Sequence, residues 1–461
     1  MIFSSKLRNK FVKDKLFKMR FLVSLFRVIF GLTFILSGFL KVVDPVGTGL
    51  IMEEYFKMMH LSFLTSLAIP SGLILSLLEF LIGICILLGL RMKVSMRAGL
   101  LLMLFFTGLT LVLAVFNPIH DCGCFGEAIH LTNWQTFGKD VILTVLISVI
   151  FIKKKYFSSN IVASPKIEWI SIGVYALLIL GVGIDALKTQ PMMDFGNFQI
   201  GTDVNGKLEL VQENVKYNTV FTYEKYGKTQ VFNLENLPDD SWTFVDSKSV
   251  VVSGEERDAF DFTVSDLDGH YVTEKLLRTD RSIVFFIITD LQKMYNSKKW
   301  NKIKVIESQI INDGAEVIYL SSAQNQDAKD FCRAHHIPED IFLYTDYKTL
   351  ISMNRSNGGL VYMNDGVIVD KAYLGEFNKT LISKMLTSDP DYLIARKAIG
   401  QRLSYEIAIA LLLLSLVLIR IVSYYYRKID RKIRRKKALV LANKNIALVK
   451  ISEEITIHDE S

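Results

Sequence analysis

Two cysteines separated by a single glycine are the most chemically suggestive feature of this 461-residue chain. Cys122 and Cys124 lie in the segment DCGCFG and are half of the four cysteines. A disulfide between them would close a very small ring, which strains disulfide geometry and adds little chain-entropy stabilisation. Strained, exposed disulfides exchange readily with other thiols, and Gly123 and Gly126 permit a tight backbone. The spacing therefore favours thiol–disulfide exchange, with a structural or incidental disulfide as the alternative.

The residues around this pair suggest a nucleophile and a second kind of chemistry. The sequence does not decide which cysteine attacks; Asp121 beside Cys122 should slightly raise the pKa of that thiol, which marginally favours Cys124. His120, Asp121, Cys122, Cys124 and His130 also offer nitrogen, oxygen and sulfur ligands for a tetrahedral zinc ion. Their spacing matches no standard zinc module, so metal binding is the weaker alternative. No tightly bound cofactor is predicted.

Two ionisable residues fall inside apolar runs and could belong to the same site. Glu79 and Arg27 lie at depths where a charge is costly and normally pairs or lines a pathway. We expect a buried Glu79–Arg27 ion pair that locks two spans, and a proton-handling carboxylate is a compatible functional role. Lys41 and Asp44 could steady Glu79 or the cysteine loop, but we expect Lys41 to snorkel to the interface. Cys85 and Cys332 are expected to be buried, unpaired thiols.

Six apolar stretches approach the length of about 20 residues that crosses a bilayer. Half of the residues are hydrophobic, which is too apolar for a purely soluble chain of this length. The first stretch is too long, and lacks the cleavage site, for a removed signal peptide. The predicted spans are Phe21–Leu40, Ala68–Leu90, Ala98–Phe116, Phe137–Ile152, Ile167–Leu187 and Leu403–Tyr425.

Basic segments alternate between the spans and predict the orientation. Lys and Arg gather before span one, between spans two and three, after span four and after span six, and such segments stay cytoplasmic. Both termini should therefore be cytoplasmic, with DCGCFG and residues 188–402 on the opposite, oxidising side of a bacterial inner membrane. Anchoring at an anionic leaflet accounts for the net charge of +7, so nucleic acid is not an expected partner and the lipid bilayer is.

The chain is expected to divide into membrane and extracytoplasmic parts. Residues 195–252 alternate apolar and polar residues between turn residues, which predicts strands. Beyond Phe260 the pattern predicts the order βαβαβ, a hairpin and a final helix. The predicted units are a basic N-terminus (1–20), a four-span bundle (21–155), a fifth span (167–187), a β-rich subdomain (190–257), an α/β domain (258–390), a sixth span (403–425) and a basic tail (426–461).

Residues 21–155 resemble the DoxX family of membrane proteins. The matching positions are Arg27, Gly31 and Gly38 in RVIFGLTFILSGFLKVVDP, with Lys41, Asp44 and Pro45, and Glu79, Gly83 and Gly89 in LLEFLIGICILLGL. Together with DCGCFG, they bring the chain close to the MauE-like branch of that family. The resemblance implies a four-helix membrane bundle and a link to quinone-coupled sulfur oxidation or to disulfide maturation of secreted proteins.

Residues 258–390 resemble the thioredoxin-like fold but depart from it at its functional points. The loop after the first central strand reads TDLQKMYNSKKW, where a redox-active member would have Cys-x-x-Cys. Ser356-Asn357-Gly358-Gly359 stands where a cis-proline is usual, and a non-proline cis bond is costly, so we expect trans peptides there. The domain is expected to bind a partner or to orient the bundle.

Three hypotheses for function follow from these features. The first is a membrane thiol–disulfide oxidoreductase in which Cys122 and Cys124 exchange with an extracytoplasmic client protein and pass electrons to a quinone, with Asp121, Glu79 and Arg27 as supporting residues. The second is a non-enzymatic assembly factor whose soluble domain recognises the client. The third is a metal-handling membrane protein.

Overall fold

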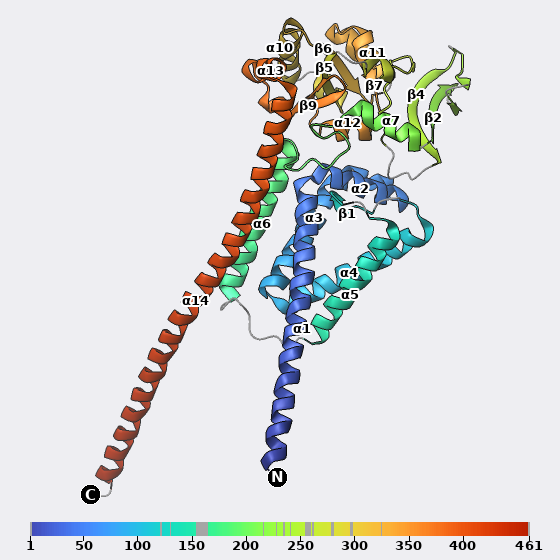
Figure 1. The fold of residues 1–461 in the computed structure, drawn as a ribbon. Coiled ribbons are helices and arrows are strands. Elements are labelled where there is room, and N and C mark those ends of the chain that lie inside the picture. The colour runs from blue at the N-terminus through green and yellow to red at the C-terminus, as the bar shows by residue number, and fades with distance from the viewer. Residues whose placement is uncertain are drawn as a thin grey trace.

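The structure is a computed structural model that combines a helical membrane part with a soluble α/β part (Figure 1). Both termini lie at one end of the molecule, and the soluble part lies at the other end. The described residues are 2–119, 122–129, 131–153, 165–214, 216–226, 228–233, 236–239, 241–253, 260, 262–277, 281–295, 298–323 and 325–459.

Six helices within the described residues are long and apolar enough to cross a membrane, which confirms the predicted number. The first four spans belong to a bundle whose helices pack as the pairs α1–α3 and α4–α5. The spans are Leu16–Val43, Ser62–Leu88, Met92–Phe116, Asn133–Ile152, Pro165–Lys188 and Pro390–Leu441. The bundle helices are α1 (Ile2–Val43), α3 (Ala68–Leu88), α4 (Met92–Phe116) and α5 (Asn133–Ile152).

Glycines allow α1 and α3 to pack closely, as small residues do between membrane helices. A Cβ added at Gly38 would lie 2.5 Å from the backbone nitrogen of Phe80. One added at Gly83 would lie 2.7 Å from the backbone nitrogen of Ile35. These contacts fix the register of the antiparallel pair and therefore decide which side chains of α1 face Glu79.

A short helix, α2 (Pro45–Met58), lies across the end of the bundle nearest the soluble part (Figure 1). Its first turn has the expected start signals, because Asp44 accepts a hydrogen bond from the Gly47 amide at 3.0 Å and Pro45 follows the cap. The 3-10 helix η1 (Ser62–Leu67) then leads into α3. The sequence did not predict α2, because it is too short to cross a bilayer.

Helices α6 (Pro165–Lys188) and α14 (Pro390–Asp459) run side by side and connect the soluble part to the membrane (Figure 1). The hydroxyl groups of Tyr175 and Ser415 lie 2.8 Å apart between them. Helix α6 also packs on α1 and α3. The predicted sixth span and basic tail thus belong to one continuous 70-residue helix.

The soluble part is built on a five-stranded sheet in the order β7-β6-β5-β8-β9. Strands β5, β6 and β7 are parallel, and β8 and β9 form an antiparallel hairpin. Apolar clusters cover both faces of β5, which is why its sequence SIVFFII is continuously apolar. The strands are β5 (Ser282–Ile288), β6 (Glu316–Ser321), β7 (Phe342–Tyr344), β8 (Gly359–Asn364) and β9 (Val367–Ala372).

Helices connect and flank this sheet in the predicted order. The core β6-β5-β8-β9, with α13 after the hairpin, is the thioredoxin-like arrangement, and β7 extends it at one edge. The helices are α8 (Thr273–Leu276), α9 (Leu291–Tyr295), α10 (Lys298–Asn312), α11 (Asn325–His335), α12 (Tyr347–Met353) and α13 (Lys379–Thr387).

A separate three-stranded antiparallel sheet projects beside this domain. Its order is β3-β2-β4, with β2 (Lys216–Lys225), β3 (Lys228–Asn233) and β4 (Thr243–Ser253). The sheet agrees with the predicted β-rich subdomain, but the region also contains a helix that was not predicted, α7 (Val204–Asn214). Asp203 explains this difference, since it accepts a hydrogen bond from the Gly206 amide at 3.0 Å in the manner of a helix cap.

An asparagine joins the two loops that differ from the usual thioredoxin-like pattern, namely the loop after β5 and the Ser356–Gly359 loop before β8. The Asn357 side chain accepts hydrogen bonds from the backbone amides of Thr289 and Asp290, at 3.0 and 3.3 Å, and donates to the Asp290 carbonyl at 3.0 Å. The peptide bonds of the Ser356–Gly359 loop are trans, as expected. Asn357 therefore ties the loop after β5 to the loop before β8.

Candidate functional site

The two cysteines lie in the loop between α4 and α5, at the end of the bundle nearest the soluble part. Cys122 and Cys124 are both free thiols, and their Sγ atoms are 2.9 Å apart. Gly123 and Gly126 adopt left-handed φ angles of 59° and 63°, and the Gly126 amide donates to the Gly123 carbonyl at 2.9 Å. The glycines thus form the tight turn that brings the sulfur atoms together, and β1 (Cys124–Glu127) follows.

Three helices hold this loop in place. The Tyr55 hydroxyl of α2 donates to the Cys122 carbonyl at 2.8 Å. The Ser37 hydroxyl of α1 lies 2.7 Å from both the Cys124 carbonyl and Glu79 Oε2. Thr136 of α5 lies 3.4 Å from the Cys122 sulfur. The cysteine pair is therefore held to the bundle through the backbone carbonyls of both cysteines and through the side chain of Cys122.

The two thiols have opposite acidities. The hydrogen bond from the Cys124 thiol is the largest effect that lowers the pKa of Cys122 to about 7, and Thr136 and Lys139 add to it. The same hydrogen bond, together with burial, raises the pKa of Cys124 well above its ordinary value. Because the thiolate is the nucleophile, Cys122 is the better attacking group. The slight preference for Cys124 expected from the sequence considered only Asp121, which lies outside the described residues, and not the neighbouring thiol.

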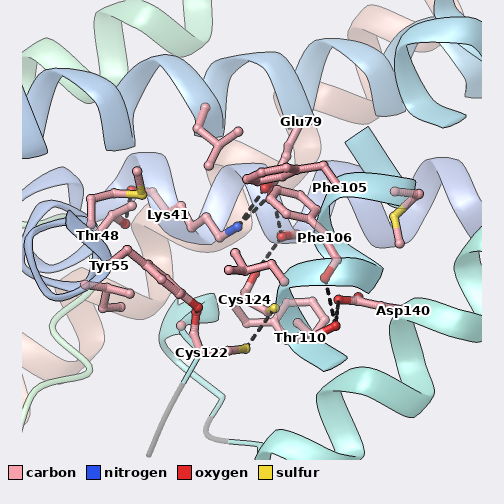
Figure 2. A pocket seen from close by; sticks show the side chains of 18 of the residues that line it. Lys41, Thr48, Tyr55, Glu79, Phe105, Phe106, Thr110, Cys122, Cys124 and Asp140 are labelled. Carbon is pink, nitrogen blue, oxygen red and sulfur yellow. Dashed lines mark hydrogen bonds and ion pairs between the residues drawn. The ribbon is translucent and has the colours of Figure 1, made fainter. Parts of the chain in front are cut away.

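The cysteines form part of the wall of a mostly apolar cavity of about 240 Å³ inside the bundle (Figure 2). Aromatic and aliphatic side chains from α1 to α5 provide most of its surface, which suits an apolar ligand. The apolar lining is Phe34, Ile51, Met52, Phe56, Met59, Leu61, Leu75, Met103, Phe105, Phe106, Leu109, Phe125 and Leu143.

Two ion pairs line the same cavity. Lys41 Nζ lies 2.8 and 2.9 Å from the carboxylate oxygens of Glu79, and both side chains are buried. Lys139 Nζ lies 3.1 Å from Asp140 Oδ1 and 4.9 Å from the centre of the Phe125 ring. Charges in a membrane interior are expensive unless they are paired, so each carboxylate has a cation beside it.

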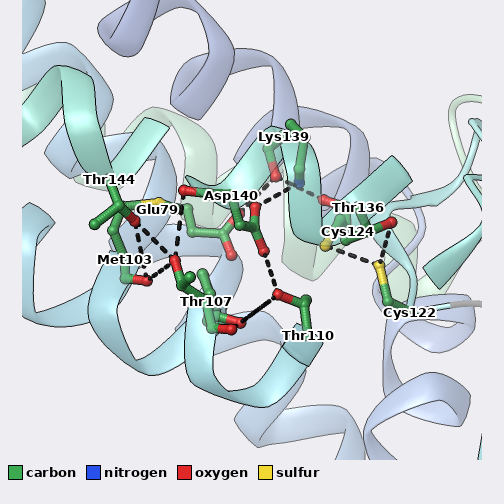
Figure 3. Close-up of polar contacts among 12 residues, drawn as sticks. Glu79, Met103, Thr107, Thr110, Cys122, Cys124, Thr136, Lys139, Asp140 and Thr144 are labelled. Carbon is green, nitrogen blue, oxygen red and sulfur yellow. Dashed lines mark hydrogen bonds and ion pairs between the residues drawn. The ribbon is translucent and has the colours of Figure 1, made fainter. Parts of the chain in front are cut away.

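A set of threonines continues from Asp140 between α4 and α5 (Figure 3). Thr110 donates to Asp140 Oδ2 at 3.2 Å, and the hydroxyl groups of Thr107 and Thr144 lie 2.7 Å apart. Thr107 also donates to the Met103 carbonyl at 2.7 Å. These contacts fix the position of the buried carboxylate relative to the cavity.

The structure brings together only some of the predicted site residues. Cys122, Cys124 and Glu79 meet at the cavity, whereas His120, Asp121 and His130 lie outside the described residues. Among the residues that the structure describes, no cluster of three His, Cys, Asp or Glu side chains could hold a metal ion.

The predicted Glu79–Arg27 ion pair is wrong, because Glu79 pairs with Lys41 instead. Arg27 lies deeper along α1 and donates to the Leu87 carbonyl at 3.2 Å. Lys41 is buried and does not snorkel to the interface as expected. The helix register explains both corrections, since 14 residues of α-helix separate Arg27 from Lys41, which is about 21 Å along the axis.

Lys139, Asp140 and Tyr55 were not identified from the sequence. Thr136, Lys139 and Asp140 recur at helical spacing on the face of α5 that meets the cysteine loop and the cavity. A Lys-Asp pair near the start of an apolar helix was the available signal. Tyr55 could not be recognised without knowing that α2 covers the loop.

The other two cysteines are buried away from this site, as expected. Cys85 lies among apolar side chains of α1, α3 and α6. Cys332 lies in the core of the soluble domain, and burial raises its pKa to about 12. Neither thiol has the properties of a reactive cysteine.

The fold and the site define a class: a membrane protein that carries a dithiol at the wall of a bundle cavity, joined to a thioredoxin-like domain. Residues 19–153 match the family described as Methylamine utilisation protein MauE, which confirms the MauE-like resemblance of the bundle. Residues 217–254, the three-stranded sheet, match a domain of unknown function (DUF8463).

Comparisons with individual proteins add little. The chain has no match among curated proteins. A similar solved structure is that of BsSco, described as a member of the Sco family of cytochrome c oxidase assembly proteins and as having a disulfide switch. The two sequences are 9% identical, and the aligned region covers 28% of this chain and 92% of the BsSco chain, with a TM-score of 0.22. The thioredoxin-like assignment therefore rests on the strand order described above.

Proposed function

We propose that this protein is a membrane thiol–disulfide oxidoreductase that oxidises an extracytoplasmic client protein and passes the electrons to a quinone. One observation carries the proposal: a free dithiol with Sγ atoms 2.9 Å apart lies at the wall of an apolar cavity within a membrane-spanning bundle. That location gives the pair access to a lipid-soluble electron acceptor. The lowered pKa of Cys122 favours its thiolate, which leaves readily when a client thiol opens the disulfide and which is the reactive form of the reduced pair toward the quinone.

The reaction balances without another co-reactant. The Cys122 and Cys124 thiols lose two electrons and two protons and form a disulfide, and the quinone gains both and becomes a quinol. A client dithiol then reduces the disulfide through a mixed disulfide and leaves with a disulfide of its own. Each cycle therefore transfers one pair of electrons from client to quinone.

The two ion pairs in the cavity suit this chemistry. Lys41 and Lys139 line the cavity and would supply positive charge to stabilise a quinone reduced within it. Glu79 and Asp140 are carboxylates that can accept protons released by the thiols. All four groups line the same cavity as the cysteines.

We also propose the orientation and location. The basic flanks of the spans support an arrangement with both termini in the cytoplasm of a bacterial cell and the protein in its inner membrane. The cysteine loop and the soluble domain then face the oxidising compartment. Both termini lie at the end of the bundle opposite to that domain (Figure 1).

Quinone reduction by the purified protein tests the proposal. The reduced protein in lipid nanodiscs, given a water-soluble quinone, should form about one quinol per cysteine pair, measured by the loss of quinone absorbance. Cys122→Ser or Cys124→Ser should abolish this reaction, while Cys332→Ser should leave it unchanged, because Cys332 is buried in the soluble domain. Absence of quinol from the unsubstituted protein, or persistence of the reaction in Cys124→Ser, would contradict the proposal.

A non-enzymatic assembly factor is the second candidate. Its supporting observation is the thioredoxin-like domain, whose loops at the usual redox position have no cysteine. If this function is correct, client maturation in cells should survive the double substitution Cys122→Ser/Cys124→Ser. The oxidoreductase requires that the same double substitution abolish it.

A further inference from the structure

Helix α2 forms one wall of the cavity and packs directly against the cysteine loop. Tyr55 holds the Cys122 carbonyl, and a Cβ added at Gly123 would lie 2.3 Å from the Cδ1 atom of Ile51. Ile51, Met52 and Tyr55 all line the cavity. The loop therefore fits under α2 without spare room.

This packing restricts access to the thiols. Cys122 is 5% exposed, and Cys124 is only partly exposed. Exchange with a protein client requires the attacking and attacked sulfur atoms to meet. A client cysteine carried on a polypeptide cannot reach Cys122 in this arrangement, so a wall of the site has to move first.

The soluble domain holds α2 from the other side. Arg355 Nε and Nη2 lie 3.2 and 2.6 Å from the two carboxylate oxygens of Asp44. The side chains of Arg355 and Asp44 are only 3% and 7% exposed. The same carboxylate caps the first turn of α2 through the Gly47 amide. One buried, two-point ion pair thus joins the start of α2 to the soluble domain.

A second pair joins the two parts farther along α2. Lys348 of α12 pairs with Glu54 at the surface. Exposed pairs contribute little to stability, so the buried Arg355–Asp44 pair is the stronger of these two contacts. Arg355, just beyond the end of α12, is also held by that helix, since its guanidinium donates to the Ile351 carbonyl at 2.6 Å.

Arg355 lies beside the two loops at which the thioredoxin-like domain differs from redox-active members of that fold. It directly precedes the Ser356–Gly359 loop, where Asn357 ties the two loops together. The corner that would carry redox chemistry in other thioredoxin-like domains is therefore adjacent to a docking contact with the bundle. This contact gives the domain, which lacks the usual Cys-x-x-Cys motif, a role inside its own chain.

We propose that the thioredoxin-like domain is a gate, which holds α2 closed over Cys122 and Cys124 through the Arg355–Asp44 pair and admits a client protein when this contact opens. The admission of a client rests on the proposed oxidoreductase function. The closing of α2 over the thiols does not depend on it. Relief of the pair by a client's own charged surface is the event that would open the gate.

Access to the thiols in the full-length, reduced protein tests the gate. The protein in nanodiscs is alkylated with a maleimide attached to a polyethylene glycol, which is too large for the closed cavity, and hydrogen exchange of α2 amides is followed in parallel. Breaking a buried ion pair shifts a local opening equilibrium, so Arg355→Gln should speed both alkylation and exchange at least about tenfold. Asp44→Asn should do the same, because Asn still caps α2 but no longer attracts Arg355.

The control is Arg333→Gln, since the Arg333 side chain is largely exposed and pairs with Asp330 within its own helix, α11. It should leave both rates unchanged. Unchanged rates in Arg355→Gln and Asp44→Asn would overturn the gate, and so would an effect of Arg355→Gln that Asp44→Asn does not reproduce. Alkylation of reduced thiols requires neither quinone nor client, so this result stands apart from the test of the oxidoreductase.

Discussion

Lys41 and Glu79 form a buried, two-point ion pair between α1 and α3, with Nζ–Oε distances of 2.8 and 2.9 Å. Their side chains are 8% and 3% exposed. Ser37 connects this pair to the Cys124 carbonyl through its hydroxyl. The pair therefore joins α1 to α3 and, through Ser37, is linked to the loop that carries the thiols.

Removing one partner of this pair should destabilise the bundle strongly. Lys41→Met leaves the Glu79 carboxylate buried without its cation, which costs about 3–5 kcal/mol in the free energy of unfolding. The double substitution Lys41→Met/Glu79→Gln should recover most of this loss, because no charge then stays buried. Chemical denaturation in detergent measures both, and equal losses in the single and double variants would contradict the buried pair.

The acidity of Cys122 should depend on its neighbouring thiol. The pKa of Cys122 is lowered from 9.0 to about 7, chiefly by the hydrogen bond from Cys124. The thiolate, and hence the rate of alkylation by iodoacetamide, should therefore rise with pH through about 7. Cys124→Ala removes the hydrogen-bond donor, so the midpoint should move up toward 9.0 and the rate at pH 7 should fall by up to about 50-fold. A midpoint that stays near 7 in this variant would disprove the shared hydrogen bond.

Lys139 should tune the same thiol through its charge. Its ammonium group also lowers the pKa of Cys122, but it is a smaller cause than the hydrogen bond from Cys124. Lys139→Gln should therefore raise the midpoint of the alkylation profile by less than Cys124→Ala does. Lys139→Arg keeps the positive charge and should keep the midpoint, so an equal shift in both variants would exclude a charge effect.

Gly123 should tolerate no side chain. Its φ angle of 59° is left-handed, and an added Cβ would meet Ile51 at 2.3 Å. Gly123→Ala should cost about 1–2 kcal/mol for the backbone alone and should displace the loop from α2, which slows formation of the Cys122–Cys124 disulfide by a mild oxidant. Gly138→Ala is the matched control, because nothing lies within 4 Å of an added Cβ there. Equal rates of disulfide formation in the two variants would contradict the tight fit.

The sequence predicted the spans and the thioredoxin-like order well, because both depend on local patterns. Long apolar runs define α1, α3 and α14, and the run SIVFFII defines the central strand. The helix α2 has no such signal, because it is too short to cross a membrane and its role depends on its contacts with the cysteine loop and with the soluble domain. The same is true of Arg355, which has a partner 311 positions away.

The candidate site was predicted only in part for a related reason. The cysteine spacing identified the reactive pair, but the partner of Glu79 depends on the register of α1 against α3. Glycine contacts such as Gly38 with Phe80 set that register. Hydropathy does not encode it, so Arg27 and Lys41 could not be distinguished as partners.

The redox state of the cysteine pair in intact cells tests the central claim most directly. Cells are quenched with acid, free thiols are alkylated with a mass-shifting maleimide, and the pair is scored after the quinone pool has been driven oxidised or reduced. The account predicts that Cys122 and Cys124 are mainly disulfide-bonded when the pool is oxidised and accumulate as thiols when it is reduced. A pair that keeps one redox state whatever the state of the pool would contradict a quinone-linked thiol oxidoreductase.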